Sequence, residues 1–184
     1  MYDIRKKGLP AELVVGGEPF PIDTDFRTWI RWITQVQRDD FAGAYIFTGR
    51  VPDDPEWVRA ASDFALCRSD TPRSLGDESS IRTFDYIEDG ARVVAAFQQV
   101  YGIDLTDADM HWWRFKMLLD NLPDGTALGQ VMSFRAYRKP SPGKNAEQEF
   151  YARMKRAYSL PPIRTSEAEA FIAKQREAFG LLKP

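Results

Sequence analysis

Apolar residues recur every three to four positions along most of this chain, which is the spacing of amphipathic helices. The block from Tyr101 to Pro123 is the most informative example. At about 100° per residue its apolar side chains fall into two sectors, whereas a surface helix usually has one apolar stripe. One sector contains Trp112, Phe115, Leu118, Leu119 and Leu122, and the other contains Met110, Trp113 and Met117.

Two apolar faces have two explanations. Either both faces of the helix are buried in the core, which is the more common case for aromatic stripes, or one face is available to a partner. Methionine repacks easily and tryptophan anchors strongly at interfaces. We therefore take Met110, Trp113 and Met117 as the candidate face for binding a partner or for self-association.

Helix boundaries in this region follow from capping residues. Thr106 and Asp109 have nearly the spacing of a capping box, so we expect them to begin the two-faced helix, and Pro123 to end it. Asp89 is expected to cap the preceding helix. Gly102 lies where a left-handed terminator is expected for that helix.

Residues 11–22 have a different pattern, with two short apolar runs on either side of Gly16 and Gly17. Two glycines supply the positive φ angles of a tight turn, so this segment is predicted to be a β-hairpin. Proline cannot donate to a sheet ladder, which confines the second run to an edge. Asp23 or Thr24 then caps a helix that extends to about residue 37.

The rest of the chain alternates helical patterns with breaks. Further helices are expected after Asp54, over 126–137, over 145–158, and from Ser166 onwards. Residues 68–80 have almost no apolar side chains and are predicted to form an exposed loop. The last two helices make a C-terminal helical pair over 139–184. The predicted fold is mainly α, a single compact helical domain over 1–184 with a small N-terminal β-hairpin.

Composition agrees with a globular protein. The chain has 184 residues, 43% of them hydrophobic and 28% charged, with a net charge of −2. No apolar run approaches the roughly 18 residues that a membrane span needs, and no signal-peptide pattern is present. Cys67 is the single cysteine, which fits a reducing compartment.

Catalytic patterns are missing from the sequence. His111 is the single histidine, so the usual zinc ligand sets cannot form, and we expect it near a helix start. Glycine-rich phosphate loops and serine-nucleophile motifs are also absent. The many carboxylates lie before helices, where they cap N–H groups, although they leave a hydrolase as an alternative. We expect no enzymatic activity, no cofactor and no metal.

Basic residues are concentrated near the C-terminal end. Between residues 131 and 164 there are eight, interleaved with aromatic residues, against Glu147 and Glu149. Such a segment suits a nucleic-acid surface, a solvated helix face, or a patch that meets the acidic helix starts of a neighbouring subunit. The alternative function is therefore a nucleic-acid-binding protein that uses residues 135–156.

Three blocks of sequence resemble one known family. They are FDYIEDGARVVAAFQQVYGIDL (84–105), MHWWRFKMLLDNLP (110–123) with its consecutive tryptophans, and FRAY (134–137). In this order they are similar to the bacteriophage gene-product-fifteen family, which is encoded just ahead of the tape-measure gene of long-tailed phages and prophages.

The resemblance implies a role in tail morphogenesis. Such proteins are regarded as tail assembly chaperones that keep the long helical tape-measure protein soluble until tail-tube subunits polymerise around it. It implies no catalytic residues. We accordingly expect a non-enzymatic protein of the host bacterial cytoplasm whose partners are the tape-measure protein and the tail-tube subunits. Self-association remains open, and neither membrane nor nucleic acid is an expected partner.

Overall fold

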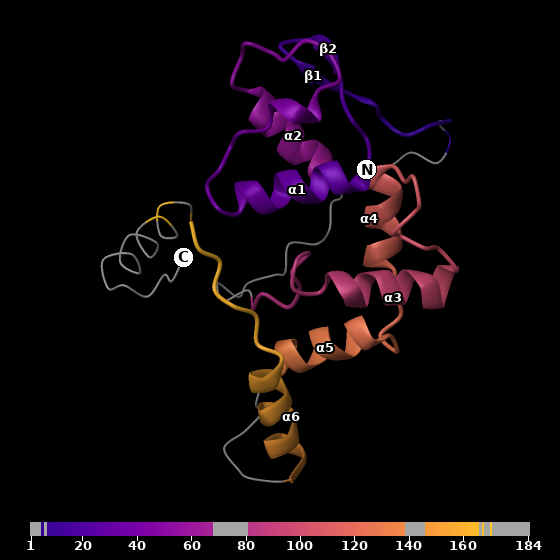
Figure 1. Cartoon of the computed structure of the whole chain (residues 1–184), viewed down its shortest axis with the longest axis vertical. Coiled ribbons are helices and arrows are strands. Elements are labelled where there is room, and N and C mark those ends of the chain that lie inside the picture. The colour runs from indigo at the N-terminus through magenta and orange to yellow at the C-terminus, as the bar shows by residue number, and fades with distance from the viewer. Residues whose placement is uncertain are drawn as a thin grey trace, which may run out of the picture. The chain divides into compact units, whose positions relative to one another are not determined.

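The computed structural model describes residues 5, 7–67, 81–138, 146–165, 167 and 170. The fold is mainly α with one two-stranded hairpin, as predicted (Figure 1). Where we expected a single domain over 1–184, the chain groups into two compact units. The N-terminal unit comprises 2–68 and 162–184, and the helical unit comprises 69–161. The predicted loop over 68–80 and the last predicted helix lie outside the described residues.

The N-terminal unit begins with the predicted hairpin. Strands β1 (Glu12–Val15) and β2 (Glu18–Pro21) are antiparallel, with Leu13 opposite Phe20. Gly16 and Gly17 have φ angles of +58° and +85°, so both adopt the left-handed region that the two-residue turn requires. Because side chains alternate along a strand, Leu13, Val15 and Phe20 point to the core and are buried.

Helix α1 (Phe26–Val36) begins one or two residues later than predicted. Its N-cap is Asp25, whose carboxylate accepts a hydrogen bond from the Arg27 backbone N–H at 2.8 Å. Asp23 instead accepts from the Asp25 N–H and from the Thr28 hydroxyl. Several acceptors compete in the Asp-Thr-Asp run, and the sequence alone does not decide which of them caps the helix.

A short 3₁₀ helix, η1 (Ala44–Ile46), and helix α2 (Trp57–Ala65) complete this unit. Gly43 precedes η1 and lies directly against an aromatic side chain. A Cβ atom at Gly43 would be 2.6 Å from Nε1 of Trp32 and 2.9 Å from Trp57. The core of the unit is closed around Trp29, whose ring centroid lies 4.3 Å from that of Phe64.

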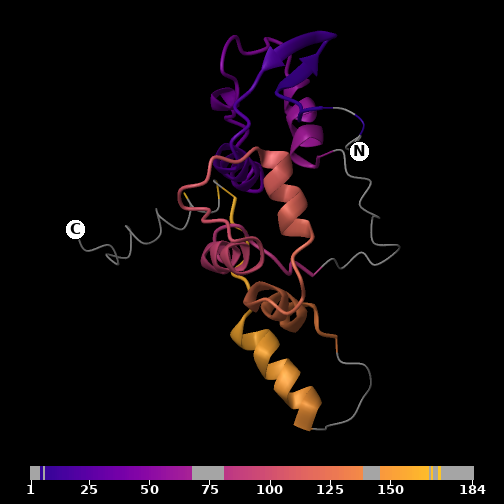
Figure 2. The same ribbon diagram turned by 90° about the vertical axis from the view of Figure 1, so that its right-hand side faces the viewer.

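The helical unit contains α3 (Gly90–Tyr101), α4 (Trp112–Asp120), α5 (Ala127–Ala136) and α6 (Ala146–Ala157). Both views show α3 between α4 and α5, with α6 following on the far side of α5 (Figures 1 and 2). Phe97 of α3 stacks on Phe115 of α4 at 5.1 Å, and the Tyr101 hydroxyl donates to the Leu118 carbonyl. These contacts fix the angle between α3 and α4.

Helix α4 is shorter than the sequence suggested, because the predicted Thr106–Asp109 start is wrong. His111 is the N-cap, and its Nδ1 accepts from the Trp113 N–H at 3.0 Å. Thr106 belongs to a separate turn, in which it donates to Asp104. The predicted terminator is confirmed, since Gly102 has a φ of +67° and ends α3.

Asp89 occupies the N-cap position of α3, but the expected side-chain cap is absent. Instead Asp85 accepts from the Ile87 and Glu88 N–H groups just before the helix. The Asp89 side chain is completely buried and pairs with Arg135 of α5 at 2.6 and 3.0 Å. A carboxylate that the sequence assigned to a helix end therefore forms the buried ionic contact of the unit.

Candidate functional site

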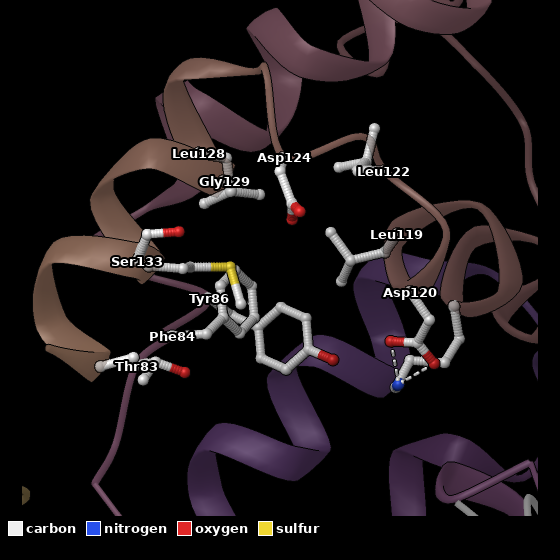
Figure 3. A pocket seen from close by; sticks show the side chains of 13 residues that line it. Thr83, Phe84, Tyr86, Leu119, Asp120, Leu122, Asp124, Leu128, Gly129 and Ser133 are labelled. Carbon is white, nitrogen blue, oxygen red and sulfur yellow. Dashed lines mark hydrogen bonds and ion pairs between the residues drawn. The ribbon is translucent and has the colours of Figure 1, made fainter.

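A hollow of about 540 Å³ lies within the helical unit between α4, α5 and the segment that precedes α3. Figure 3 shows Leu119 on one side, Leu128 and Ser133 on the other, and Phe84 and Tyr86 completing the lining. We call this hollow the α4–α5 groove. Its full lining is Thr83, Phe84, Tyr86, Lys116, Leu119, Asp120, Leu122, Asp124, Leu128, Gly129, Met132, Ser133 and Ala136.

The apolar lining comes from helical spacing on two elements. Leu128, Met132 and Ala136 are four residues apart on α5 and therefore share one face. Leu119 belongs to the last turn of α4, and Leu122 follows that helix. Leu128 is buried, whereas Met132, Leu119 and Leu122 are half-buried. The half-buried side chains provide apolar surface that an incoming partner could cover.

Gly129 allows α5 to lie close to the α4–α5 connection at one end of the groove. A Cβ atom at Gly129 would lie 2.6 Å from the Asp124 carbonyl oxygen and 2.8 Å from its Cα. The Thr126 hydroxyl accepts from the Gly129 N–H at 3.0 Å and caps α5. The first turn of α5 is thus held against the α4–α5 connection, which sets the width of the groove at this end.

The polar residues lie around the edge. Lys116 and Asp120 form an ion pair along α4, and Asp124 is exposed at the end of the groove. The segment before α3 forms another wall of the groove. The buried Arg135 holds this segment in place, because its guanidinium donates to the Thr83 carbonyl at 2.9 Å. In the same segment, the rings of Phe84 and Tyr86 make an edge-to-face contact, with their centroids 4.8 Å apart. The arrangement is an apolar floor with a partly charged edge.

Among the described residues, no cluster of three or more His, Cys, Asp or Glu side chains could hold a metal ion. The groove instead offers Leu, Met, Phe and Tyr surfaces, which suit apolar side chains of another polypeptide.

The predicted partner-binding face is separate from the groove. Met110 and Trp113 are only 7% and 6% exposed, and Met117 is half-buried. None of the three lines the groove. Their role in binding a partner stays a prediction.

Sequence reasoning missed the groove for a physical reason. Leu119 and Leu122 belong to the larger apolar sector of the two-faced helix, and Leu128 lies on a separate predicted helix over 126–137. Periodicity identifies which side chains share a face, but it does not reveal where two such faces fail to meet completely. The width of the Leu-rich sector was the one available signal.

The structure also corrects the prediction of a basic surface over residues 135–156. Arg135 is 5% exposed and belongs to the interior of the unit, so it contributes nothing to a basic surface. Arg138, Arg153 and Arg156 are exposed, and Lys155 is half-buried. Lys139 and Lys144 lie outside the described residues.

Comparison with known proteins defines the class of this chain as a bacteriophage protein. The family described as Bacteriophage Gp15 protein matches residues 61–160, more than half of the 184 residues, and the match includes all four helices of the helical unit and the α4–α5 groove. The chain belongs to the bacteriophage Gp15 family. No curated protein and no solved structure matches it. In the described residues, every helix is too short or too polar to cross a membrane.

Proposed function

We propose that this phage protein is a non-enzymatic tail assembly chaperone, which acts in the cytoplasm of the host bacterium. Its client is a helical segment of the tape-measure protein, held until tail-tube subunits polymerise around it. The observation that carries the proposal is the α4–α5 groove, because it lies wholly within the residues that match the phage family. The gene position typical of the family supplies the identity of the client.

The lining of the groove supports a helical client. An amphipathic helix inserts its apolar side chains into a groove and leaves its polar face at the edge. Leucine and methionine side chains adapt to different apolar partners, which suits a chaperone that must accept successive faces of a long client. The charged residues at the edge keep the empty groove hydrated at its margins.

The direct test measures binding of peptides from the adjacent tape-measure protein by fluorescence anisotropy. Met132→Glu places a charge on the groove floor and should weaken binding at least about tenfold, because a buried unpaired charge is costly. Ile87→Glu is the matched control, since Ile87 is 63% exposed in the same unit and does not line the groove.

Met132→Leu keeps the apolar volume and should retain binding, which separates loss of the groove from loss of the fold. Circular dichroism of each variant reports whether the helices are intact. Equal affinities for the wild type and a folded Met132→Glu variant would rule out the groove as the client site.

The face formed by Met110, Trp113 and Met117 is the second proposed contact for a client or another copy. Met117→Ala is the informative variant, because Met117 is half-buried while Trp113 is nearly inaccessible. A lower affinity for the peptide, with an unchanged free energy of unfolding, would support this face as a contact for a client or another copy. A Trp113→Ala variant that simply unfolds would assign that residue to the core.

A further inference from the structure

The charges that line the α4–α5 groove are not balanced. Three of the lining residues are charged, namely Lys116, Asp120 and Asp124. Lys116 and Asp120 are four residues apart on α4 and form an ion pair, so their charges cancel. The carboxylate of Asp124 remains, and it gives the lining a net charge of one negative unit.

The connection between α4 and α5 places Asp124 at one end of the groove. Its backbone lies directly against α5, since a Cβ atom at Gly129 would be 2.6 Å from the Asp124 carbonyl oxygen. Figure 3 shows the Asp124 carboxylate directed into the space between Leu128 on one side and Leu119 on the other. The Asp124 side chain is exposed, and a helix that lies in the groove would cover it.

The groove itself supplies no counter-charge to this carboxylate. Lys116 is the one cation of the lining, and it is engaged by Asp120. Every lining residue is among the described residues, and within that part of the chain no hydrogen bond or ion pair reaches the Asp124 side chain. The complementary positive charge is therefore one that an occupant can bring.

Covering Asp124 has an energetic consequence for the occupant. A carboxylate that loses water without gaining a partner is costly, so an apolar or acidic side chain placed over Asp124 weakens binding. A lysine or arginine removes that cost, because its charged end meets the carboxylate. Its aliphatic stem lies along apolar surface such as that of Leu122 and Leu128.

We propose that the groove selects client helices that carry a lysine or arginine beside the apolar stripe, and that Asp124 pairs with this cation. The inference rests on the proposed function, because it concerns the occupant of the same groove. The cation lies three or four residues from the nearest apolar anchor, which puts both on one face of the client helix. Asp124 is thus a specificity-determining residue.

The same arrangement gives the client helix a direction. Asp124 lies at one end of the groove, and Figure 3 shows Leu119 between it and Asp120, whose charge Lys116 neutralises. A cation at one end of the apolar stripe meets Asp124, whereas a cation at the other end meets a neutral pair. Clients that differ only in the end that carries the cation should therefore bind with different affinity.

A role within α5 is the competing explanation for Asp124. A negative charge just before a helix stabilises the positive end of the helix dipole. The side-chain cap of α5 is already supplied by Thr126, whose hydroxyl accepts from the Gly129 N–H. The dipole explanation predicts that Asp124 affects the stability of the helical unit and has no effect on the choice of client.

The test compares derivatives of one tape-measure peptide that binds the full-length protein. In the first set, the residue one turn before the apolar stripe is Arg, Gln or Glu, and in the second set the residue one turn after it is varied in the same way. Fluorescence anisotropy measures each affinity. In one set only, the Arg peptide should bind about threefold more tightly than the Gln peptide and about tenfold more tightly than the Glu peptide. Raising the ionic strength should reduce these ratios.

Variants of Asp124 assign the preference to its charge. Asp124→Asn should bind the Arg and Gln peptides equally, Asp124→Lys should prefer the Glu peptide, and Asp124→Glu should retain the wild-type order. Asp109→Asn is the matched control, because Asp109 is exposed in the same unit and does not line the groove. Circular dichroism and chemical denaturation report the fold and the stability of each variant.

The outcomes separate this inference from the proposed function. Equal binding of all the derivatives by the wild type, with binding still abolished by Met132→Glu, would overturn the inference and leave the proposed function standing. Failure of every tape-measure peptide to bind would overturn both. An Asp124→Asn variant that is less stable but keeps the preference for Arg would assign the carboxylate to α5 and overturn the inference.

Discussion

Arg135 and Asp89 form a buried two-point ion pair between α5 and the start of α3. The two hydrogen bonds measure 2.6 and 3.0 Å, and Asp89 is fully inaccessible. The same guanidinium donates to the carbonyls of Thr83 and Tyr158 at 2.9 and 2.7 Å. One side chain thus joins the wall of the α4–α5 groove, the start of α3 and the end of α6.

Arg135→Met should destabilise the helical unit strongly. The substitution leaves the buried Asp89 carboxylate with Arg92 as an ion-pair partner and the Asp85 N–H as a hydrogen-bond donor, and it leaves the Thr83 and Tyr158 carbonyls without the Arg135 donor. Removing one member of a buried pair costs about 3–5 kcal/mol. Chemical denaturation should measure this loss, and the double variant with Asp89→Asn should lose less than the sum of the single changes. A single-variant loss below about 1 kcal/mol would contradict the role given to Arg135.

Gly43→Ala should destabilise the N-terminal unit, although Gly43 has an ordinary negative φ. The new Cβ would meet Nε1 of Trp32 at 2.6 Å and Trp57 at 2.9 Å, and both rings are part of packed aromatic surface. Overpacking of this kind costs about 1–3 kcal/mol. Gly49→Ala is the control, because no atom lies within 4 Å of its Cβ position. Thermal unfolding followed by tryptophan fluorescence compares the two, and equal midpoints would refute the prediction.

Gly129→Ala should widen the α4–α5 groove and weaken client binding. Alanine is favoured over glycine inside a helix by about 1 kcal/mol, but its Cβ would lie 2.6 Å from a backbone carbonyl that cannot move freely. The clash should outweigh the helix preference, so stability should fall. Gly90→Ala at the start of α3 meets no atom within 4 Å and should cause no loss. Denaturant midpoints and peptide affinity, measured together, check both statements.

Asp104 should titrate below the ordinary aspartate value. Hydrogen bonds from the Thr106 side chain and then its backbone N–H hold the pKa of Asp104 below 3.8. These hydrogen bonds to the Asp104 carboxylate therefore stabilise the folded state above pH 3.8. Their contribution is lost as the pH falls through the lower pKa that Asp104 has in the folded state. Thr106→Ala removes the larger contribution and should raise the pKa towards 3.8. Carboxyl-carbon NMR titration of both proteins makes the comparison, and an unchanged pKa in the variant would contradict the assignment.

Local features of the fold could be predicted from the sequence. The hairpin at Gly16 and Gly17 depends on positive φ angles that glycine supplies, and the end of α3 depends on Gly102 in the same way. Helical periodicity likewise identified the existence of α1, α4 and α5. These signals lie within a few residues of the structure they produce.

Features that depend on distant partners could not be predicted. Asp89 follows the rules for a helix cap, and only the folded chain shows that Arg135, 46 positions away, takes its carboxylate. His111 replaced Thr106 as the start of α4, because the preceding turn closes on Asp104 instead. The groove arises from incomplete packing between elements, so no single segment contains its signal.

The hydrogen bonds of Arg135 also bear on how this chain could be divided or recombined. Thr83 and Tyr158 lie 75 positions apart in the sequence, and one guanidinium holds both of them. A segment whose ends meet can be inserted into a host sequence with little entropic penalty for closing the loop. The segment from Thr83 to Tyr158 therefore has the topology of a transplantable module, because one side chain holds its two ends together.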